Sequence, residues 1–585
     1  MVYVALACYF GVLVLFGVVA GRRISTITDY YLGGKRLSYW VAAFSARATG
    51  ESAWLYLGLT GLGATVGLPA LWVVAGELLG VAGAWFLMAG PFKLTTDRQN
   101  ALTIPDYLIG RFAGGARADR WTVVLRSVAV VALAGFVTIY VSAQIDATGK
   151  AFAGFLDWNY YVGIVVGFAI VMTYTSWGGF LAVAWSDVFQ GIMMAVGLVA
   201  LPIGAIVALG GLSGTQTALA VVDPGMLTVW GDGGFTWQNV FTVISYAAIG
   251  LGFLGSPQIF VRFMAIRDVG EIRRGRWVAL VFTLFTDTGA VMAGFLGSVL
   301  LVGDRGSQLA LLGGGGELVL PLLTQALFPP LIVGCFVAAV LAATMSTIDS
   351  LLVVASSAVT HDVYKRMPGR AESSDALIRT SRRITVVLGV CAFVMAWGMS
   401  LLAPDRTIFW YVIFGWSGLT ATFCPMMILS LAWPRYNVYG AITSMVSGIV
   451  SIPFFAFVVP ALPGWASLLV HAEELAPSFL VSLLCGIVVT LLTRDEAPQE
   501  RATGEIVKGL ASKQSWPCLC WRSAFGVVGC RHAGAGARTA KTSNRSPLVL
   551  RIPCGIPSGA TRSMPAFMGT SCVSRRNSPD PSMTW

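Results

Sequence analysis

The densest group of side chains that could bind a cation lies in the apolar segment 329–357, where residues 343–350 read ATMSTIDS. Ser346, Asp349 and Ser350 are spaced i, i+3 and i+4, which places two hydroxyls and a carboxylate on one face of a helix. Thr347 adds a third hydroxyl. Hard cations such as sodium prefer several oxygen ligands. The run therefore predicts an ion site, although such hydroxyls can also bond back to their own helix or bridge to a neighbouring one.

Ionisable residues also occur inside other apolar segments of the chain. They are Arg47, Glu51, Glu77, Asp187 and Asp287. Charges at membrane depth are costly and usually face a partner or a water-filled path. Arg47 and Glu51 are spaced i, i+4, so they could neutralise each other on one helix face, and Glu77 could serve the same end. Asp287 is assigned no role.

Two apolar segments are interrupted by residues that break helices. Segment 238–264 contains three glycines and Pro257, and segment 40–65 contains small and polar residues from 47 to 53. A broken helix at membrane depth is tolerated where it lines a cavity. Broken helices at corresponding positions of two halves indicate a transporter binding site. We therefore expect two repeats, at about 40–211 and 238–432.

The composition requires lipid as the solvent for this chain. Its 585 residues are 56% hydrophobic and only 11% charged, whereas soluble domains are about 25% charged. A membrane-spanning helix needs roughly 20 mainly apolar residues. Thirteen segments qualify: 2–21, 40–65, 70–91, 127–147, 159–178, 181–211, 238–264, 277–303, 329–357, 384–403, 408–432, 438–462 and 475–493.

The connecting loops predict how these segments are oriented. Lys and Arg concentrate on the cytoplasmic side of membrane proteins. Nearly all loop Lys and Arg fall in alternate loops starting with 22–39, whereas the other set holds only Lys150, Arg305 and Arg406. This alternation predicts a multi-pass protein of the cell inner (plasma) membrane, with its N-terminus outside and its C-terminus in the cytoplasm.

The last part of the chain differs in kind from the apolar body. Of the formal net charge of +11, residues 516–585 carry nine Lys and Arg and one Asp. The apolar body is therefore close to neutral, and the basic excess does not indicate a nucleic-acid partner. We expect a transmembrane domain over 1–496 and a basic, disordered cytoplasmic tail over 497–585, because the tail has neither a helical nor a strand period.

Several motifs together resemble the sodium/solute symporter family, and within it the bacterial sodium/proline symporters. They are DYYLGG at 29–34, LTIPDY at 102–107, TIY at 138–140, GGFLAVAWSD at 178–187, RFMA at 262–265 and LAATMST at 341–347. The resemblance covers roughly residues 25–460. It implies an all-α polytopic membrane protein of LeuT-type fold, with five-plus-five inverted repeats and further peripheral helices.

The resemblance also implies where cations bind. The first sodium site would use the backbone carbonyls of Ala48, Glu51 and Ala343 and the hydroxyls of Ser346 and Thr347. Some members carry a second cation site, which would fall here on Asp187, Ser346, Asp349 and Ser350. Asp349 stands where a related pattern has Ser, so two carboxylates could face one site. That would favour tighter cation binding or a shared proton.

The implied substrate site departs more from the proline-type pattern. Tyr140 and Pro257 match it, whereas Phe253 replaces a Tyr, Ile249 replaces a Trp and Gly50 replaces an Asp. The residues expected at the site are Arg47, Ser52, Tyr140, Ile249, Phe253 and Pro257. Within this compact pocket, Arg47 could pair with a substrate carboxylate.

These features predict a sodium-coupled symporter that imports proline or a related amino or organic acid by alternating access. Sodium is the coupling ion, and no cofactor is expected. One alternative is a proton-coupled permease that uses Asp187, Asp349 or Glu51. A membrane solute sensor is disfavoured because no signalling domain follows residue 500. An enzyme is disfavoured because the histidines His361, His471 and His532 lie in loops and tail.

Overall fold

The computed structural model describes residues 1–112, 120–220, 222–302, 311–366, 373–463 and 470–493, and the statements below refer to these residues. The predicted tail at 497–585 lies outside them, as does Arg305. Within the described ranges the chain is helical, and its only strand-like pairing is one isolated bridge between Leu37 and Ile266.

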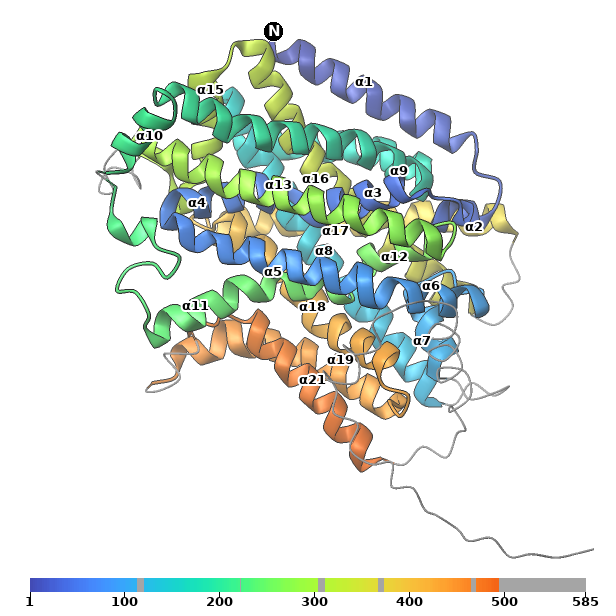
Figure 1. Ribbon diagram of the computed structural model, residues 1–585. Coiled ribbons are helices and arrows are strands. Elements are labelled where there is room, and N and C mark those ends of the chain that lie inside the picture. The colour runs from blue at the N-terminus through green and yellow to red at the C-terminus, as the bar shows by residue number, and fades with distance from the viewer. Residues whose placement is uncertain (113–119, 221, 303–310, 367–372, 464–469, 494–585) are drawn as a thin grey trace, which may run out of the picture. The chain divides into compact units, whose positions relative to one another are not determined.

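The two ranges expected to form repeats, about 40–211 and 238–432, each contain several helices (Figure 1). In the first they are α3 (Tyr39–Ala53), α4 (Thr60–Val66), α5 (Leu71–Ala82), α6 (Ala89–Arg98), α8 (Arg120–Leu156) and α9 (Tyr160–Ala208). In the second they are α11 (Trp237–Ala248), α12 (Pro257–Ala265), α13 (Val269–Leu301), α16 (Pro330–Ala358), α17 (Ser374–Leu402) and α18 (Ile408–Ala432). Outside the repeats lie α1 (Val2–Gly21), α19 (Val438–Pro453) and α21 (Leu475–Leu492), and the connectors hold α2 (Ile27–Leu32), α7 (Ile104–Phe112), α10 (Gly211–Leu219) and α15 (Val319–Leu327).

Eleven helical segments of the described chain are long and apolar enough to cross a membrane. Two more of the thirteen predicted spans also lie on helices. One is the shorter apolar helix Tyr160–Ser176, and the other is the broken segment from α3 to α4. The multi-pass helical architecture is thus confirmed, while the count of thirteen crossings stays a prediction.

The first predicted interruption lies at the end of α3. Ser52 has φ +33° and ψ −167°, so the α-helix breaks there, and residues 54–59 form a wider π-helical stretch before α4 begins. Left-handed backbone is costly for a residue with a side chain. The amide of Ala53 is satisfied from outside α3, because it donates to Oε1 of Gln144 on α8 at 2.9 Å.

The second interruption separates α11 from α12. A 3₁₀ stretch over Ile249–Leu254 ends α11, and α12 begins at Pro257 after an extended Gly255. Pro is favoured at a helix start, where its missing N–H is not needed. Neighbouring side chains satisfy the carbonyls of the break: Trp416 Nε1 donates to the Ile249 oxygen at 2.9 Å, and Cys424 Sγ to the Gly252 oxygen at 3.3 Å.

The most deeply buried helices form the centre of the transmembrane part. In the apolar windows of Pro330–Val363 and Ile408–Ala432, 83% and 89% of residues are buried, against 22% for α1. In Figure 1, α16 lies behind α3 and α13 in the middle of the bundle, while α1 and α21 lie at opposite edges of the view. The polar run of 343–350 therefore sits on a helix surrounded by protein.

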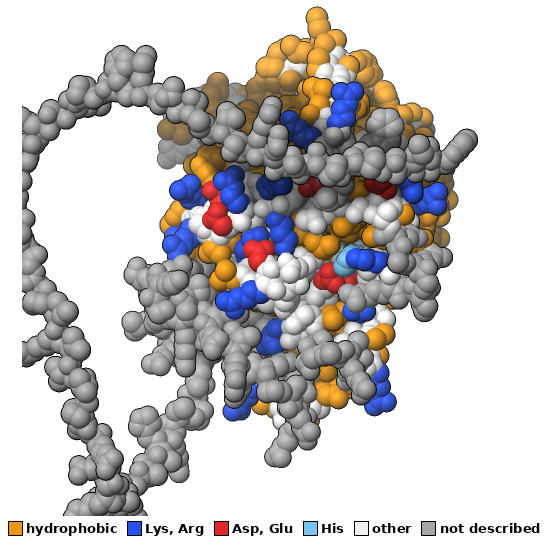
Figure 2. All heavy atoms as spheres, turned by 90° about the vertical axis from the view of Figure 1, so that its right-hand side faces the viewer, with side chains coloured by type: hydrophobic (Ala, Val, Ile, Leu, Met, Phe, Trp, Pro, Cys, Tyr) orange, Lys and Arg blue, Asp and Glu red, His pale blue; other side chains and the backbone are white. Residues whose placement is uncertain are grey.

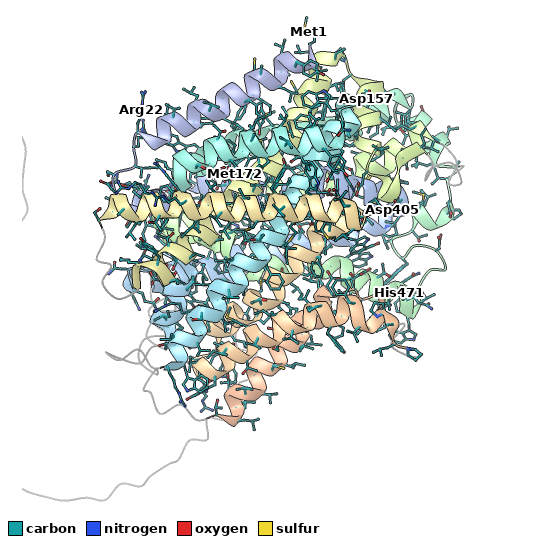
Figure 3. All side chains as sticks on the ribbon, turned by 180° about the vertical axis from the view of Figure 1, so that it is seen from behind. Met1, Arg22, Asp157, Met172, Asp405 and His471 are labelled. Atoms are coloured by element: carbon teal, nitrogen blue, oxygen red, sulfur yellow. The ribbon has the colours of Figure 1, made fainter. Side chains whose placement is uncertain are left out.

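The loops group at two ends of the helical bundle. In Figure 3, Arg22 lies at one end of the view, whereas Asp157, Asp405 and His471 lie toward the other. These are loops that the charge pattern assigns to opposite sides of the membrane. Figure 2 looks onto the end at which α2, α6, α7 and α12 finish, and Lys and Arg side chains gather on it.

At that basic end, backbone hydrogen bonds join the approach to α3 with the exit from α12. The Leu37 amide donates to the Ala265 oxygen at 3.1 Å, and the Arg267 amide donates to the Leu37 oxygen at 3.0 Å. The Tyr39 amide also donates to Oε2 of Glu271 at 2.7 Å. The broken helices of the two repeats are thus tied together at one end.

Candidate ion and substrate site

The hydroxyls of the polar run bridge α16 to the broken helix α3. Ser346 Oγ lies 2.9 Å from the Ala48 oxygen and 3.1 Å from the Ala343 oxygen. Thr347 Oγ1 lies 3.0 Å from the Thr49 oxygen and 3.2 Å from the same Ala343 oxygen. All of these residues are fully buried. The structure therefore brings together four of the five residues expected at the first sodium site.

The fifth residue, Glu51, lies one helical turn beyond Ala48, where α3 breaks. Its carbonyl accepts from the Trp54 amide at the end of the helix. The oxygens gathered here are carbonyls and hydroxyls, which is the neutral, hard donor set that suits a small monovalent cation. The residues present thus fit sodium.

A buried arginine occupies the region expected to form a second cation site. Arg262 of α12 donates through Nη2 to Asp187 Oδ2 at 3.0 Å, to Ser350 Oγ at 2.5 Å and to Thr49 Oγ1 at 2.8 Å. Ser45 Oγ donates to the same Asp187 oxygen at 2.5 Å. Side chains from α3, α9, α12 and α16 therefore meet at one guanidinium.

Asp349 has a different partner. Tyr174 of α9 donates to Asp349 Oδ2 at 3.1 Å, and Ser350 Oγ lies 3.3 Å from Asp349 Oδ1. The resemblance implies that Asp187 and Asp349 could face one ion. In the structure, each of these two carboxylates has a different partner. A cation held by Asp187, Ser346, Asp349 and Ser350 would have to displace Arg262 from Asp187.

The residues expected to bind the solute converge from both repeats. Tyr140 of α8 donates to Ser52 Oγ at 3.4 Å, and its ring lies edge-on to Trp416 of α18 at 6.2 Å between centroids. Phe253 packs on the same indole at 5.3 Å. Ile249 joins the group through its carbonyl, which accepts from Trp416.

Pro257 lies at the first turn of α12 and is buried. A further expected solute residue on a broken helix is Arg47 of α3. Its guanidinium lies over the Phe253 ring at 4.6 Å and pairs with three carboxylates, those of Glu51, Glu77 and Asp287. Arg47 Nε and Nη1 have no hydrogen-bond partner among the residues that the structure describes.

Several residues of this region were not identified from the sequence. Gln144, Trp416 and Tyr174 lie on predicted spans but carry no motif of their own, and Arg262 was noted only within a family motif. Their partners are 75 to 175 positions away along the chain. A pattern within one helix cannot reveal such contacts. The one available signal was that Arg262 and Gln144 are polar residues inside apolar segments.

The chain is similar to known proteins along most of its length. The sequence profile of the family described as "Sodium:solute symporter family" matches residues 30–448 of this chain. A Bacillus subtilis protein named "High-affinity proline transporter PutP" is 35% identical over 84% of this chain and 98% of its own length. The "Sodium/proline symporter" of Escherichia coli is 32% identical over 82% of this chain and 91% of its own.

A solved structure has a similar fold. It is a Na⁺-coupled sialic acid symporter in a substrate-bound outward-open state, which superposes with a TM-score of 0.67 over 85% of this chain and 99% of its own, at 21% sequence identity. At that identity the likeness supports the LeuT-type fold. With the matched profile covering most of its length, the chain belongs to the sodium:solute symporter family.

Proposed function

We propose that this protein imports proline together with sodium across the cell membrane. The observation that carries the proposal is the pair of hydroxyls on α16, Ser346 and Thr347, which contact carbonyl oxygens of α3 just before that helix breaks at Ser52. The relatives that cover most of the chain are named for proline transport. Family and site chemistry thus support the same function.

Sodium would act by joining the two helices that supply its ligands. The proposed ligands are the oxygens of Ala48, Glu51 and Ala343 with the hydroxyls of Ser346 and Thr347. Alternating access requires the sodium-bound state to differ in stability between outward- and inward-open forms. Since α3 carries both ion ligands and solute residues, ion binding would order α3 for the solute.

The proposed solute site suits a small zwitterion with an apolar ring. Aromatic faces of Phe253 and Trp416 would cover the apolar part. Ser52 and Tyr140 offer hydroxyls, and Arg47 offers the unpaired Nε and Nη1 for a carboxylate. Ile249 and Pro257 would shape the wall at the second broken helix. Proline has each of these features, and other amino acids or organic acids share some of them.

We propose that a second cation can bind at Asp187, Ser346, Asp349 and Ser350, but only in one conformational state of the protein. Arg262 pairs with Asp187 in the structure, so the second cation would bind only in a state in which this pair opens. We also propose the orientation predicted from loop charge, with the N-terminus outside and the tail in the cytoplasm. The lipid bilayer, sodium and a small solute are then the partners.

The test is uptake of labelled L-proline into proteoliposomes under an imposed sodium gradient and, separately, an imposed proton gradient. The expected result is accumulation that requires sodium and is lost in the double variant Ser346→Ala/Thr347→Ala. Proline uptake driven by protons alone would contradict the sodium proposal and favour the proton-coupled permease. Failure of proline to accumulate under either gradient would exclude it as the substrate.

A further inference from the structure

A histidine and two aspartates meet where the connector helix α7 approaches the end of α16. His361 and Asp362 lie on a π-helical turn, Val359–Val363, that follows α16, and Asp106 lies in the first turn of α7. His361 Nδ1 lies 3.3 Å from Asp106 Oδ2 and 3.9 Å from Asp362 Oδ1. One ligand atom from each residue lies within 4.8 Å of the other two. We name these three residues the His–Asp cluster.

Two side chains of the His–Asp cluster are buried and each has an atom that lacks a hydrogen-bond partner among the residues that the structure describes. They are His361, through Nδ1, and Asp362, through Oδ1, and the two side chains are 8% and 0% exposed. Consecutive residues of a helix do not normally face each other, yet these two atoms are 3.9 Å apart. Buried polar groups are almost always satisfied in native proteins. A cation between the two atoms would satisfy both.

We infer that the His–Asp cluster binds a divalent transition cation such as Zn²⁺. Zinc lies about 2.0–2.1 Å from its nitrogen and oxygen ligands, so a tetrahedral site places those ligands about 3.3 Å from one another. The observed separations of 3.3 and 3.9 Å are close to that value. Two carboxylates balance the charge of a divalent ion, and an imidazole nitrogen favours zinc and its neighbours over sodium or calcium.

Three protein ligands leave one coordination position open. Structural zinc sites instead use four protein ligands and remain closed. The His–Asp cluster therefore suits an ion that binds reversibly, with water in the fourth position. The Asp106 side chain is 15% exposed, which provides a side from which the ion can enter.

Neighbouring groups hold the three ligands in place. Thr103 Oγ1 donates to Asp362 Oδ2 at 2.6 Å and accepts from the Asp106 amide at 3.1 Å. Asp106 Oδ2 also accepts from the Leu102 amide at 3.3 Å. The ring of Tyr31 on α2 packs edge-on to the imidazole, at 6.4 Å between centroids. Outer contacts of this kind orient the ligands of a bound metal.

The bound ion would link two parts of the helical bundle. Helix α7 is also bonded to α18, because Tyr107 Oη and Ser430 Oγ lie 2.9 Å apart and Arg111 Nε donates to the Ser430 oxygen at 2.9 Å. An ion in the His–Asp cluster would therefore resist movement of α16 relative to α18 at the end that Figure 2 shows. Because α16 carries the hydroxyls of the proposed sodium site, the ion should slow transport. This last step rests on the proposed function, whereas ion binding does not.

The first test measures metal binding by the purified full-length protein, made without a polyhistidine tag and with its cysteines alkylated. Co²⁺ is the probe, because its visible absorption depends on the ligands around it. We expect one Co²⁺ to bind per chain and Zn²⁺ to displace it. Thr103→Val should weaken Co²⁺ binding roughly 10- to 100-fold, as loss of an outer contact does, and His361→Gln should weaken it further.

The matched control is His471→Gln, because His471 is exposed and lies toward the opposite end of the molecule from Arg22. Asp106→Asn is a second ligand variant, at a position that is partly exposed and tolerates a change more readily. Co²⁺ binding that neither His361→Gln nor Asp106→Asn weakens would show an adventitious ion only and would overturn the inference. So would the absence of any Co²⁺ absorption, since His361 would then serve as an ion-pair partner alone.

The second test asks whether the ion restrains transport. Sodium-driven proline uptake into proteoliposomes is measured with Zn²⁺ on both sides and again after an excess of EDTA. We expect Zn²⁺ to slow uptake by the wild type, EDTA to restore it, and uptake by His361→Gln to ignore Zn²⁺. Equal slowing of both proteins, or of neither, would overturn the restraint of α16. Co²⁺ binding without any proline uptake would support the His–Asp cluster and overturn the proposed function.

Discussion

The hydroxyls of Ser346 and Thr347 together make four contacts to backbone oxygens in the centre of the molecule. Each bonds once within α16 and once across to α3. A Ser or Thr that bonds only to its own helix does not select a partner helix. The contacts to Ala48 and Thr49 do select a partner helix, which is α3. The two hydroxyls therefore bond back to their own helix and also bridge to a neighbouring one.

Substitution of Ser346 by Ala should weaken sodium binding. The variant loses one of the five proposed ligands, a contact to a charged group that is worth about 1–3 kcal/mol by analogy with a hydrogen bond to an ion. We expect the KM for sodium to rise roughly 5- to 150-fold, as measured by uptake at varied sodium concentration. The matched control is Ser357→Ala on the same helix, whose hydroxyl donates only to Val354 at 2.7 Å. Equal KM values in the two variants would remove Ser346 from the site.

Substitution of Gly50 by Ala should disturb the solute region. A methyl group there would lie 2.8 Å from Cε1 of the Phe253 ring, which is itself packed on Trp416. Overpacking of this kind costs about 1–3 kcal/mol. We expect a lower melting temperature and a higher KM for the solute. Gly135→Ala is the control, because no atom lies within 4 Å of its added methyl; equal effects from both would refute the packing argument.

At the scale of elements, the breaks in α3 and at α11–α12 are completed by side chains from other helices. Gln144 of α8 accepts from the Ala53 amide and donates to Ser52 Oγ at 3.3 Å. Trp416 and Cys424 of α18 satisfy carbonyls of the second break. A broken helix leaves backbone groups unpaired, and within a membrane each must find a partner. The breaks therefore depend on α8 and α18.

Replacement of Gln144 by Leu should destabilise the break in α3. The variant loses both hydrogen bonds, and the buried Ala53 amide is left without an acceptor, at a cost of about 1–3 kcal/mol. We expect a lower melting temperature together with slower maximal uptake. Gln325→Leu serves as the comparison, because Gln325 makes one hydrogen bond, to Phe155 at 3.3 Å, away from the breaks. If it lowers both measurements as much, the role given to Gln144 is wrong.

Much at this scale could be predicted from the sequence. Hydropathy located the spans, and Gly250 to Pro257 located the second break, because helix breakers are local properties of the chain. The positive φ of Ser52 could not be predicted, since Ser commonly adopts right-handed backbone. Nor could the Arg262–Asp187 pair, whose members lie 75 positions apart. Partner choice between helices is set by packing, which a single-sequence pattern does not contain.

At the scale of the whole molecule, burial separates two kinds of helix. The polar and charged chemistry lies on helices near the centre, whereas α1 and α21 present apolar side chains outward. The tail at 497–585 is predicted to contribute nothing to this arrangement. A chain ending at residue 496 should therefore transport as fast as the full chain. Complete loss of uptake, with normal insertion confirmed by membrane fractionation, would contradict this prediction.

The stability of the whole protein should depend on pH through Glu473, in the turn before α21. Burial, with the nearby charge of Glu474, raises its pKa from 4.5 to about 7. The folded state then binds this proton more tightly than the unfolded state, so the stabilisation is present below about 4.5 and is lost as pH rises to about 7. The melting temperature of Glu473→Gln, relative to wild type, should rise across that range. A constant difference between the two would show that Glu473 does not titrate there.

The tie between Leu37 and the end of α12 has a consequence for observing the transport cycle. Its two hydrogen bonds join backbone to backbone, so of all substitutions only Pro, which lacks the N–H, would delete one of them. If the end of the molecule that Figure 2 shows is the cytoplasmic one, the bonds must open whenever the solute leaves on that side. The amide hydrogens of Leu37 and Arg267 would then exchange with solvent deuterium only during inward opening. Their exchange rate would therefore report how often the protein opens inward, with no probe attached to any side chain.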